Sequence, residues 1–190
     1  MNYAQIRKYD IANGPGVRTT IFLTGCTLNC KNCFNKEYQN FHFGKVFDEK
    51  AFEEVMDCLS DANISGLSVL GGEPFDNLAG LREFITKVRA NSEKDIWIYS
   101  GYTFEELLEK DGAMDVLKNI DVLVDGRFVE DLKDLKLKFR GSSNQRIIDM
   151  KRTLEEDRIL LMDKYMKEDW LFSLPFFMPN RWQSMVYGVD

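Results

Sequence analysis

Three of the four cysteines stand close together in the sequence and carry its clearest chemical signal. Cys26, Cys30 and Cys33 fall within eight positions, whereas Cys58 is distant. A chain of 190 residues can bury a sizeable core and does not need disulfide bonds. Clustered thiols in such a chain indicate metal or redox chemistry. Two other interpretations are open: three unrelated buried thiols, or a zinc site that Cys58 completes.

The number of cysteines in this loop indicates which kind of centre they hold. Iron–sulfur clusters usually take four thiolate ligands. The spacing Cys26-x-x-x-Cys30-x-x-Cys33 supplies three, which would leave one iron of a cubane open to a small molecule. An open coordination position suits a catalyst, whereas a fully ligated cluster only carries electrons. We interpret Cys58 as a structural thiol, since free cysteine is often buried. The alternative is a four-cysteine zinc or electron-transfer iron–sulfur module without radical chemistry.

The composition argues against several other classes of function. Acidic residues outnumber basic ones by 31 to 25, and the formal charge is −6. We therefore expect neither nucleic acid nor a membrane surface as a partner. The single histidine, His42, excludes a two-histidine metal site, and we assign it no role. No apolar stretch is long enough to span a bilayer and the N-terminus lacks the pattern of a secretory signal, so we expect a cytoplasmic protein.

The elements that must position the cysteines alternate between strand and helix. Asp48 and Asp76 are predicted N-caps of two helices, and Thr103 with Glu106 forms the pattern of a capping box. Strands separated by helices favour a mostly parallel α/β sheet, and the chain is short for a full eight-unit barrel. We therefore predict an open, partial β/α barrel. The predicted strands span residues 17–25, 67–70, 96–99, 120–124 and 146–148.

The distinctive polar and glycine-rich segments all follow predicted strands. They are the cysteine loop and residues 71–74, 100–101 and 125–127. The carboxyl ends of parallel strands share one edge of a sheet, and ligands bind at that edge. We therefore expect these segments, although distant in sequence, to meet at one mouth.

The loop CTLNCKNC at residues 26–33 resembles the signature of the radical S-adenosylmethionine superfamily. The preceding segment DIANGPGVR, at residues 10–18, resembles that of glycyl-radical-enzyme activases, and the resemblance covers residues 1–154. It departs from the superfamily at Asn32, where an aromatic residue often precedes the third cysteine. Here the aromatic residue, Phe34, follows Cys33.

The resemblance implies a fold of the radical S-adenosylmethionine type and a set of site residues. Cys26, Cys30 and Cys33 would hold a 4Fe–4S cluster with one open iron, which S-adenosylmethionine would chelate. No catalytic residue is implied beyond the cluster and this cofactor. The implied cofactor-binding residues are Asn32, Cys33, Phe34, Gly71, Gly72, Glu73, Pro74, Ser100, Asp125, Arg127, Ser142 and Asn144.

Several of these residues have a plainer interpretation. Residues 71–74 alone would be a turn that ends a strand. Ser100 is equally typical of a position before a helix. Asp125 and Arg127 are also compatible with a surface ion pair.

The resemblance also implies an enzymatic function. The protein would be a radical oxidoreductase that generates a 5′-deoxyadenosyl radical and installs a glycyl radical on anaerobic ribonucleoside-triphosphate reductase. A reducing electron donor such as a flavodoxin would be a second partner.

The composition changes after the region that carries the resemblance. We predict a core domain at residues 1–154 and an aromatic-rich extension at residues 155–190, which contains Trp170 and Trp182. Such an apolar segment packs on its own core or lies at an interface, since aromatic residues concentrate at both.

Overall fold

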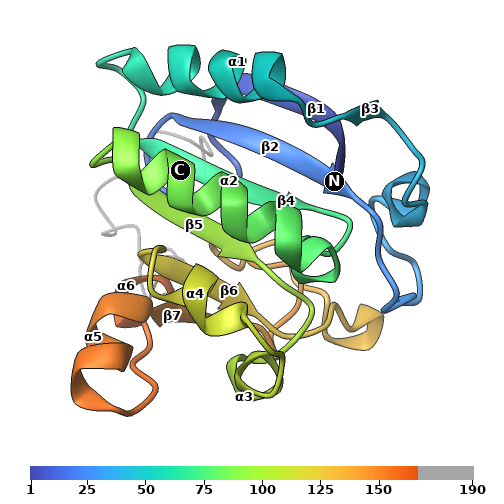
Figure 1. The fold of residues 1–190 in the computed structure, drawn as a ribbon. Helices are drawn as coiled ribbons and strands as arrows, with labels where there is room; N and C mark the ends of the chain where they lie inside the picture. The colour runs from blue at the N-terminus through green and yellow to red at the C-terminus, as the bar shows by residue number, and fades with distance from the viewer. Residues whose placement is uncertain (167–190) are drawn as a thin grey trace, which may run out of the picture.

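Seven strands form one sheet in the computed structural model, which describes residues 1–166. Their order across the sheet is β3-β1-β2-β4-β5-β6-β7 (Figure 1). Their bounds are β1 Asn2–Asp10, β2 Arg18–Thr24, β3 Lys45–Val46, β4 Gly66–Gly71, β5 Asp95–Tyr99, β6 Val122–Asp125 and β7 Arg146–Asp149.

The described residues contain six α-helices and three 3-10 turns, of which α5 and α6 follow the last strand. The helices are α1 Glu49–Ser60, α2 Leu78–Asn91, α3 Phe104–Leu108, α4 Ala113–Leu117, α5 Met150–Glu156 and α6 Asp163–Met166. The 3-10 turns are η1 Lys36–Gln39, η2 Pro74–Asn77 and η3 Glu130–Leu132. None of the helices in residues 1–166 combines the length and hydropathy that crossing a bilayer requires.

The five predicted strands exist as β2, β4, β5, β6 and β7, but the expectation of a mostly parallel sheet is wrong. The pairs β2–β4, β4–β5 and β5–β6 are parallel, whereas β1–β2, β1–β3 and β6–β7 are antiparallel. The short connection at residues 11–17 cannot make a parallel crossover, and no α-helix lies between β6 and β7 to pack on the sheet. The sheet is mixed and open, and a partial barrel is not confirmed.

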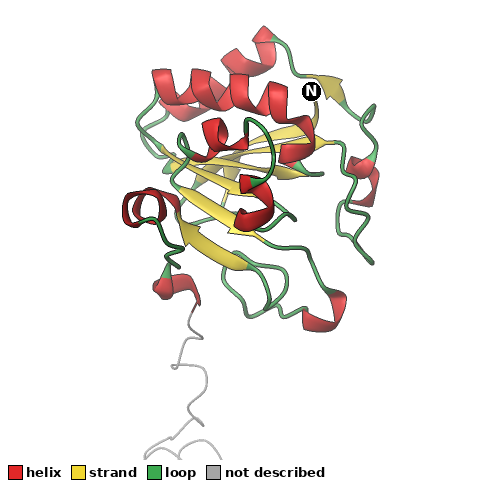
Figure 2. Ribbon diagram, turned by 60° about the horizontal axis from the view of Figure 1, so that its bottom comes forward, coloured by secondary structure: helices red, strands yellow, loops and turns green. Residues whose placement is uncertain are grey.

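The two faces of the sheet have different roles, because successive side chains of a strand point to opposite faces. Ile21, Val69 and Ile98 belong to the main core, together with the buried side chains of α1 and α2. Their neighbours Phe22, Leu70 and Tyr99 line a cavity on the other face. Figure 2 shows the longest helices on one side of the strands and mainly loops on the other. The alternation in the strands therefore leaves part of this face free for a ligand, whereas Trp97, Val124 and Ile147 pack there against Phe139 and Tyr165.

Two of the three predicted helix starts are confirmed. The Asp48 carboxylate accepts a hydrogen bond from the Ala51 amide, and Thr103 with Glu106 forms the complete capping box. Asp76 is not an N-cap, so that prediction is wrong. Pro74 opens the turn η2, which carries the chain two residues past Asp76 before α2 begins. The Asp76 carboxylate thereby becomes available for other partners.

The segment after residue 154 packs against the sheet as far as the structure describes it. The Met162 amide donates to the Ile147 carbonyl over 2.8 Å, and the Tyr165 ring lies 5.8 Å from that of Trp97. The remainder of the predicted extension, including Trp170 and Trp182, lies outside the described residues. The boundary at residue 154 stays a prediction.

Candidate functional site

A cavity of about 510 Å³ lies against the free face of the sheet, at the carboxyl ends of β2, β4 and β5. Eight of the residues that the sequence analysis selected line it. They are Cys26, Cys30, Cys33, Phe34, Gly71, Gly72, Glu73 and Ser100. The expectation that distant segments meet at one mouth is confirmed for the cysteine loop, for the ends of β4 and β5, and for Gly126 after β6.

The cysteine loop turns its three thiols toward this cavity through a specific backbone path. Asn29 and Asn32 both have left-handed backbone conformations, with φ of 47° and 54°. Asparagine tolerates this conformation better than most residues. The Cys26 amide donates to the Gln39 carbonyl over 3.1 Å, and the Cys33 amide donates to the Cys30 carbonyl over 3.3 Å. Asn32 does not line the cavity, and its backbone conformation accounts for its place in the loop.

Partial burial of two loop thiols makes them harder to ionise in the absence of a metal. Burial raises the pKa of the Cys26 thiol to about 11. Burial also raises the pKa of Cys30, and the nearby Cys33 acts in the same direction. Thiols that resist ionisation need the positive charge of a metal to become thiolates.

The arrangement of these thiols also bears on the zinc alternative. Cys58 is buried in α1 and does not line the cavity. No three His, Cys, Asp or Glu side chains within residues 1–166 gather around one point, as a single zinc ion requires. Cys58 therefore does not join the three loop cysteines in a four-cysteine site within the described residues.

The end of β4 approaches the loop so closely that it requires glycine. Gly71 has φ of 125°, which side chains rarely adopt. A Cβ atom at Gly71 would collide with the Leu23 carbonyl oxygen, and one at Gly72 would collide with the Gly25 carbonyl oxygen. The two glycines therefore bring bare backbone to the wall of the cavity.

Glu73 follows these glycines and ties the ends of β4 and β5 together. One of its carboxylate oxygens accepts from the Phe75 amide over 3.0 Å and from the Ser100 hydroxyl over 2.8 Å. The other accepts from the Gly101 amide over 2.7 Å. Glu73 is only 1% exposed, and burial raises its pKa to about 7. The carboxylate thus places Ser100 at the cavity.

The buried Glu73 predicts a pH dependence of stability. Its pKa of about 7 lies above the ordinary value of 4.5, so the folded state holds the proton more tightly than the unfolded chain does. The unfolding free energy contributed by Glu73 should therefore fall as the pH rises from about 4.5 to about 7, by up to about 3 kcal/mol. Urea unfolding of the cluster-free protein and of Glu73→Gln at pH 5, 6, 7 and 8 measures this difference. Parallel stability curves for the two proteins would contradict it.

Comparison with known proteins agrees with this site. The protein family described as a 4Fe-4S single cluster domain matches residues 12–148. The anaerobic ribonucleoside-triphosphate reductase-activating protein of Pasteurella multocida is 42% identical over 150 residues, which cover 76% of this chain and 95% of that protein. The proteins of the same name from Escherichia coli K12 and phage T4 are 41% and 37% identical, and the alignments cover 96% and 93% of them and 76% and 77% of this chain. The chain belongs to this family of reductase-activating proteins.

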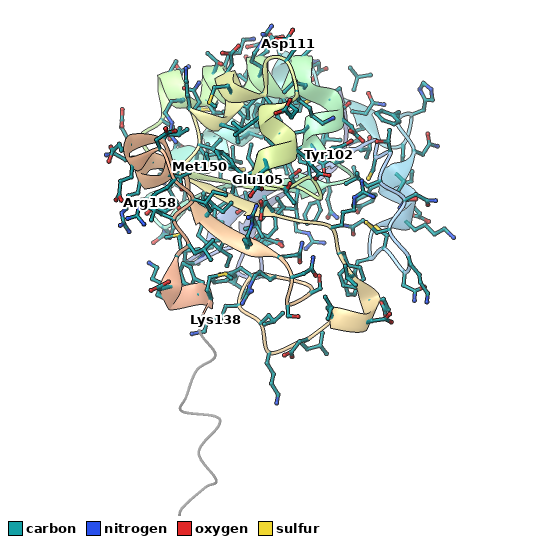
Figure 3. All side chains as sticks on the ribbon, turned by 90° about the horizontal axis from the view of Figure 1, so that it is seen from below. Tyr102, Glu105, Asp111, Lys138, Met150 and Arg158 are labelled. Atoms are coloured by element: carbon teal, nitrogen blue, oxygen red, sulfur yellow. The ribbon has the colours of Figure 1, made fainter. Side chains whose placement is uncertain are left out.

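In this reductase-activating protein, Asp76 holds the start of the cysteine loop. Its carboxylate accepts from the Thr27 amide over 2.7 Å, from the Thr27 hydroxyl over 2.9 Å and from the Tyr102 hydroxyl over 2.8 Å. Lys110 lies 3.9 Å from the same carboxylate and 4.0 Å from the centre of the Tyr102 ring. Tyr102 and Glu105 are labelled in Figure 3, beside the start of α3. Thr27, the residue after Cys26, is thereby linked through Asp76 to the segments that follow β4 and β5.

Asp76→Ala should destabilise the protein and loosen its cysteine loop. The substitution leaves the donors of Thr27 and Tyr102 without their acceptor, which costs about 2 kcal/mol. Urea unfolding and the iron bound per chain after anaerobic reconstitution measure the two effects. The matched control is Asp115→Ala, which removes an exposed ion pair with Arg82 and should change stability by about 0.5 kcal/mol or less. Equal changes in the two variants would refute the role of Asp76.

The structure does not bring the remaining selected residues to the cavity. Pro74 is buried at the start of η2. The Ser142 hydroxyl accepts from the Val129 amide over 3.2 Å, and the Asn144 side chain donates to the Arg127 carbonyl over 2.8 Å. Both residues shape the loop between β6 and β7. Arg127 does not line the cavity, although its positive charge partly opposes the rise in the pKa of Cys30 that burial causes.

Asp125 forms an ion pair, but with a different partner from the one expected. It is fully buried and accepts from the Phe104 amide over 2.7 Å and from the Arg146 guanidinium over 2.9 Å. Arg146 also bonds Glu105 over 2.6 Å. The alternative interpretation of a surface ion pair between Asp125 and Arg127 is wrong, because antiparallel β7 places Arg146 directly opposite the buried Asp125.

Several cavity residues were not selected from the sequence. They include Asn13, Tyr99, Phe128, Phe139 and Arg140. Tyr99 had a detectable signal, since it shares a face with Trp97 in a strand whose Ile96 and Ile98 are core residues. The others come from connections between strands, where no periodic pattern reports which side chains face inward.

Proposed function

We propose that this chain activates anaerobic ribonucleoside-triphosphate reductase by installing a glycyl radical, with a 4Fe–4S cluster held by Cys26, Cys30 and Cys33 and with S-adenosylmethionine as cofactor. The observation that carries this proposal is that the three loop thiols and the end of β4 face one cavity. When bound, the reduced cluster supplies the electron that cleaves the sulfonium of S-adenosylmethionine. Family membership and the names of the relatives support the target.

The residues of the chain bind and orient the cofactor. Gly71 and Gly72 line the cavity, where their backbone would offer polar contacts to the amino-acid part of the cofactor. Glu73 places Ser100 beside the same part of the cavity through the bond of 2.8 Å. Asn35 donates to the Gly71 carbonyl over 3.4 Å and so links the cysteine loop to this wall.

The apolar side chains of the cavity exclude water from the reaction. Phe22 and Leu70 line it from the sheet, and Phe34, Phe128 and Phe139 line it from the loops. These side chains would limit the access of water to a cofactor bound in the cavity. We assign no acid or base of the chain to the reaction.

The decisive experiment is electron paramagnetic resonance on an anaerobic mixture of the reconstituted protein, S-adenosylmethionine, a reductant and the reductase. A glycyl-radical doublet on the reductase is the expected result. A cluster signal without any doublet on the reductase would refute the proposal. Reduced flavodoxin should replace the chemical reductant, since we propose a flavodoxin as the electron donor.

A further inference from the structure

The arm, residues 127–141, forms most of the connection from β6 to β7 and carries exposed apolar side chains. Leu135 is 88% exposed, Leu132 is 44% exposed and Val129 is 37% exposed. Phe34 of the cysteine loop is 66% exposed and contacts the arm, with its ring 5.3 Å from that of Phe128. Three exposed apolar side chains within seven positions of one loop, which also contacts Phe34, favour an interaction surface.

The arm also forms part of the cavity wall. Phe128, Leu137 and Phe139 line the cavity, while Leu132 and Leu135 do not. Lys138, labelled in Figure 3, belongs to the same arm. The arm therefore presents one set of apolar side chains to the cavity and another set to the solvent.

Backbone and side-chain bonds hold the arm in this shape. The Val129 amide donates to the Ser142 hydroxyl over 3.2 Å, and the Ser143 amide donates to the Leu132 carbonyl over 2.9 Å. Lys133 forms a β-bridge with Ser142 and lies 4.9 Å from the centre of the Phe34 ring. A surface that is ordered before binding loses less conformational freedom when a partner docks.

We propose that Phe34, Val129, Leu132 and Leu135, the apolar patch, are the docking surface for the reductase. The inference rests on the proposed function. The reacting glycine must enter the cavity, and the patch belongs to the two segments, the cysteine loop and the arm, that supply Phe34 and Phe128 to the cavity wall. Electron-transfer encounters are small and transient, whereas apolar side chains concentrate at the centre of more durable interfaces. The patch therefore suits the protein substrate rather than the electron donor.

The test introduces a charge at the most exposed position of the patch. Leu135→Asp should weaken binding to the reductase at least about tenfold, which gel filtration and titration of the glycyl-radical yield against reductase concentration both measure. Cleavage of S-adenosylmethionine with dithionite, without the reductase, should equal that of the unmodified protein. The matched control is Val46→Asp in β3, where Val46 is 69% exposed at the other edge of the sheet. This variant should bind the reductase normally.

Three results would overturn the docking surface. The first is that Leu135→Asp binds the reductase as tightly as Val46→Asp does. A lower melting temperature of Leu135→Asp alone would show that the chain covers the patch itself. Slower reduction by flavodoxin with unchanged reductase affinity would assign the patch to the donor. Absence of any glycyl radical with the unmodified protein is a different outcome, because it refutes the proposed function instead.

Discussion

Cys33→Ala should abolish the iron–sulfur absorbance of the anaerobically reconstituted protein, whereas Cys58→Ala should keep it. Cys33 lines the cavity with the other two loop thiols. Without Cys33, a cubane would have only two protein ligands and would not be held stably. Cys58 lies in α1, away from the cavity, so its removal deletes only a buried sulfur. The iron bound per chain and the visible spectrum measure both variants, and activation of the reductase should follow the iron content.

Cys58→Ala is also the control for folding, because it truncates a buried residue at a cost of about 1 kcal/mol. Loss of the cluster in Cys58→Ala would favour the four-thiolate module. Retention of a full cluster in Cys33→Ala would refute the assignment of the loop. The far-ultraviolet circular dichroism of both variants should remain that of the folded protein.

Glu73→Gln should weaken S-adenosylmethionine binding by more than about tenfold and lower the unfolding free energy by about 2 kcal/mol. The carboxylate accepts from the Phe75 amide, the Ser100 hydroxyl and the Gly101 amide. The amide of glutamine has one acceptor oxygen in place of two, so at least one of these buried donors loses its partner. Ser100 and the end of β5 would then shift relative to Gly71 and Gly72.

Isothermal titration with S-adenosylmethionine and urea unfolding measure these two effects. The matched control is Glu83→Gln on α2, whose exposed carboxylate pairs only with Lys87 among the described contacts and should leave both quantities unchanged. A Glu73→Gln protein that binds the cofactor normally would show that the carboxylate has no part in shaping the site.

The sequence alone located the part of the site that depends on local patterns. The cysteine spacing and the glycine pair at the end of β4 can be recognised in the sequence, because cluster ligation and close backbone approach each need particular residue types. The strands β2, β4 and β5 carry enough consecutive buried residues to be recognised. The mouth of the cavity follows from these elements.

The pairings between distant segments could not be predicted in the same way. Strand β1 alternates irregularly between buried and exposed residues and contains bulges, so its sequence pattern is weak. Asp125 meets Arg146 only because β7 runs antiparallel to β6. Asp76 meets Thr27 across 49 positions of the chain, and no local propensity encodes that contact. Tertiary geometry decides each of these partners.

The turn that follows β4 carries Glu73 and Asp76 only three positions apart, and they reach different parts of the mouth. One carboxylate holds Ser100, and the other holds Thr27 beside Cys26. A ligand that stiffens either contact also restrains the short segment that bears the second. By thermodynamic reciprocity, cluster loading should then raise affinity for S-adenosylmethionine by the same factor as S-adenosylmethionine strengthens cluster retention. We therefore expect cluster loading and cofactor binding to be coupled through the turn that carries Glu73 and Asp76.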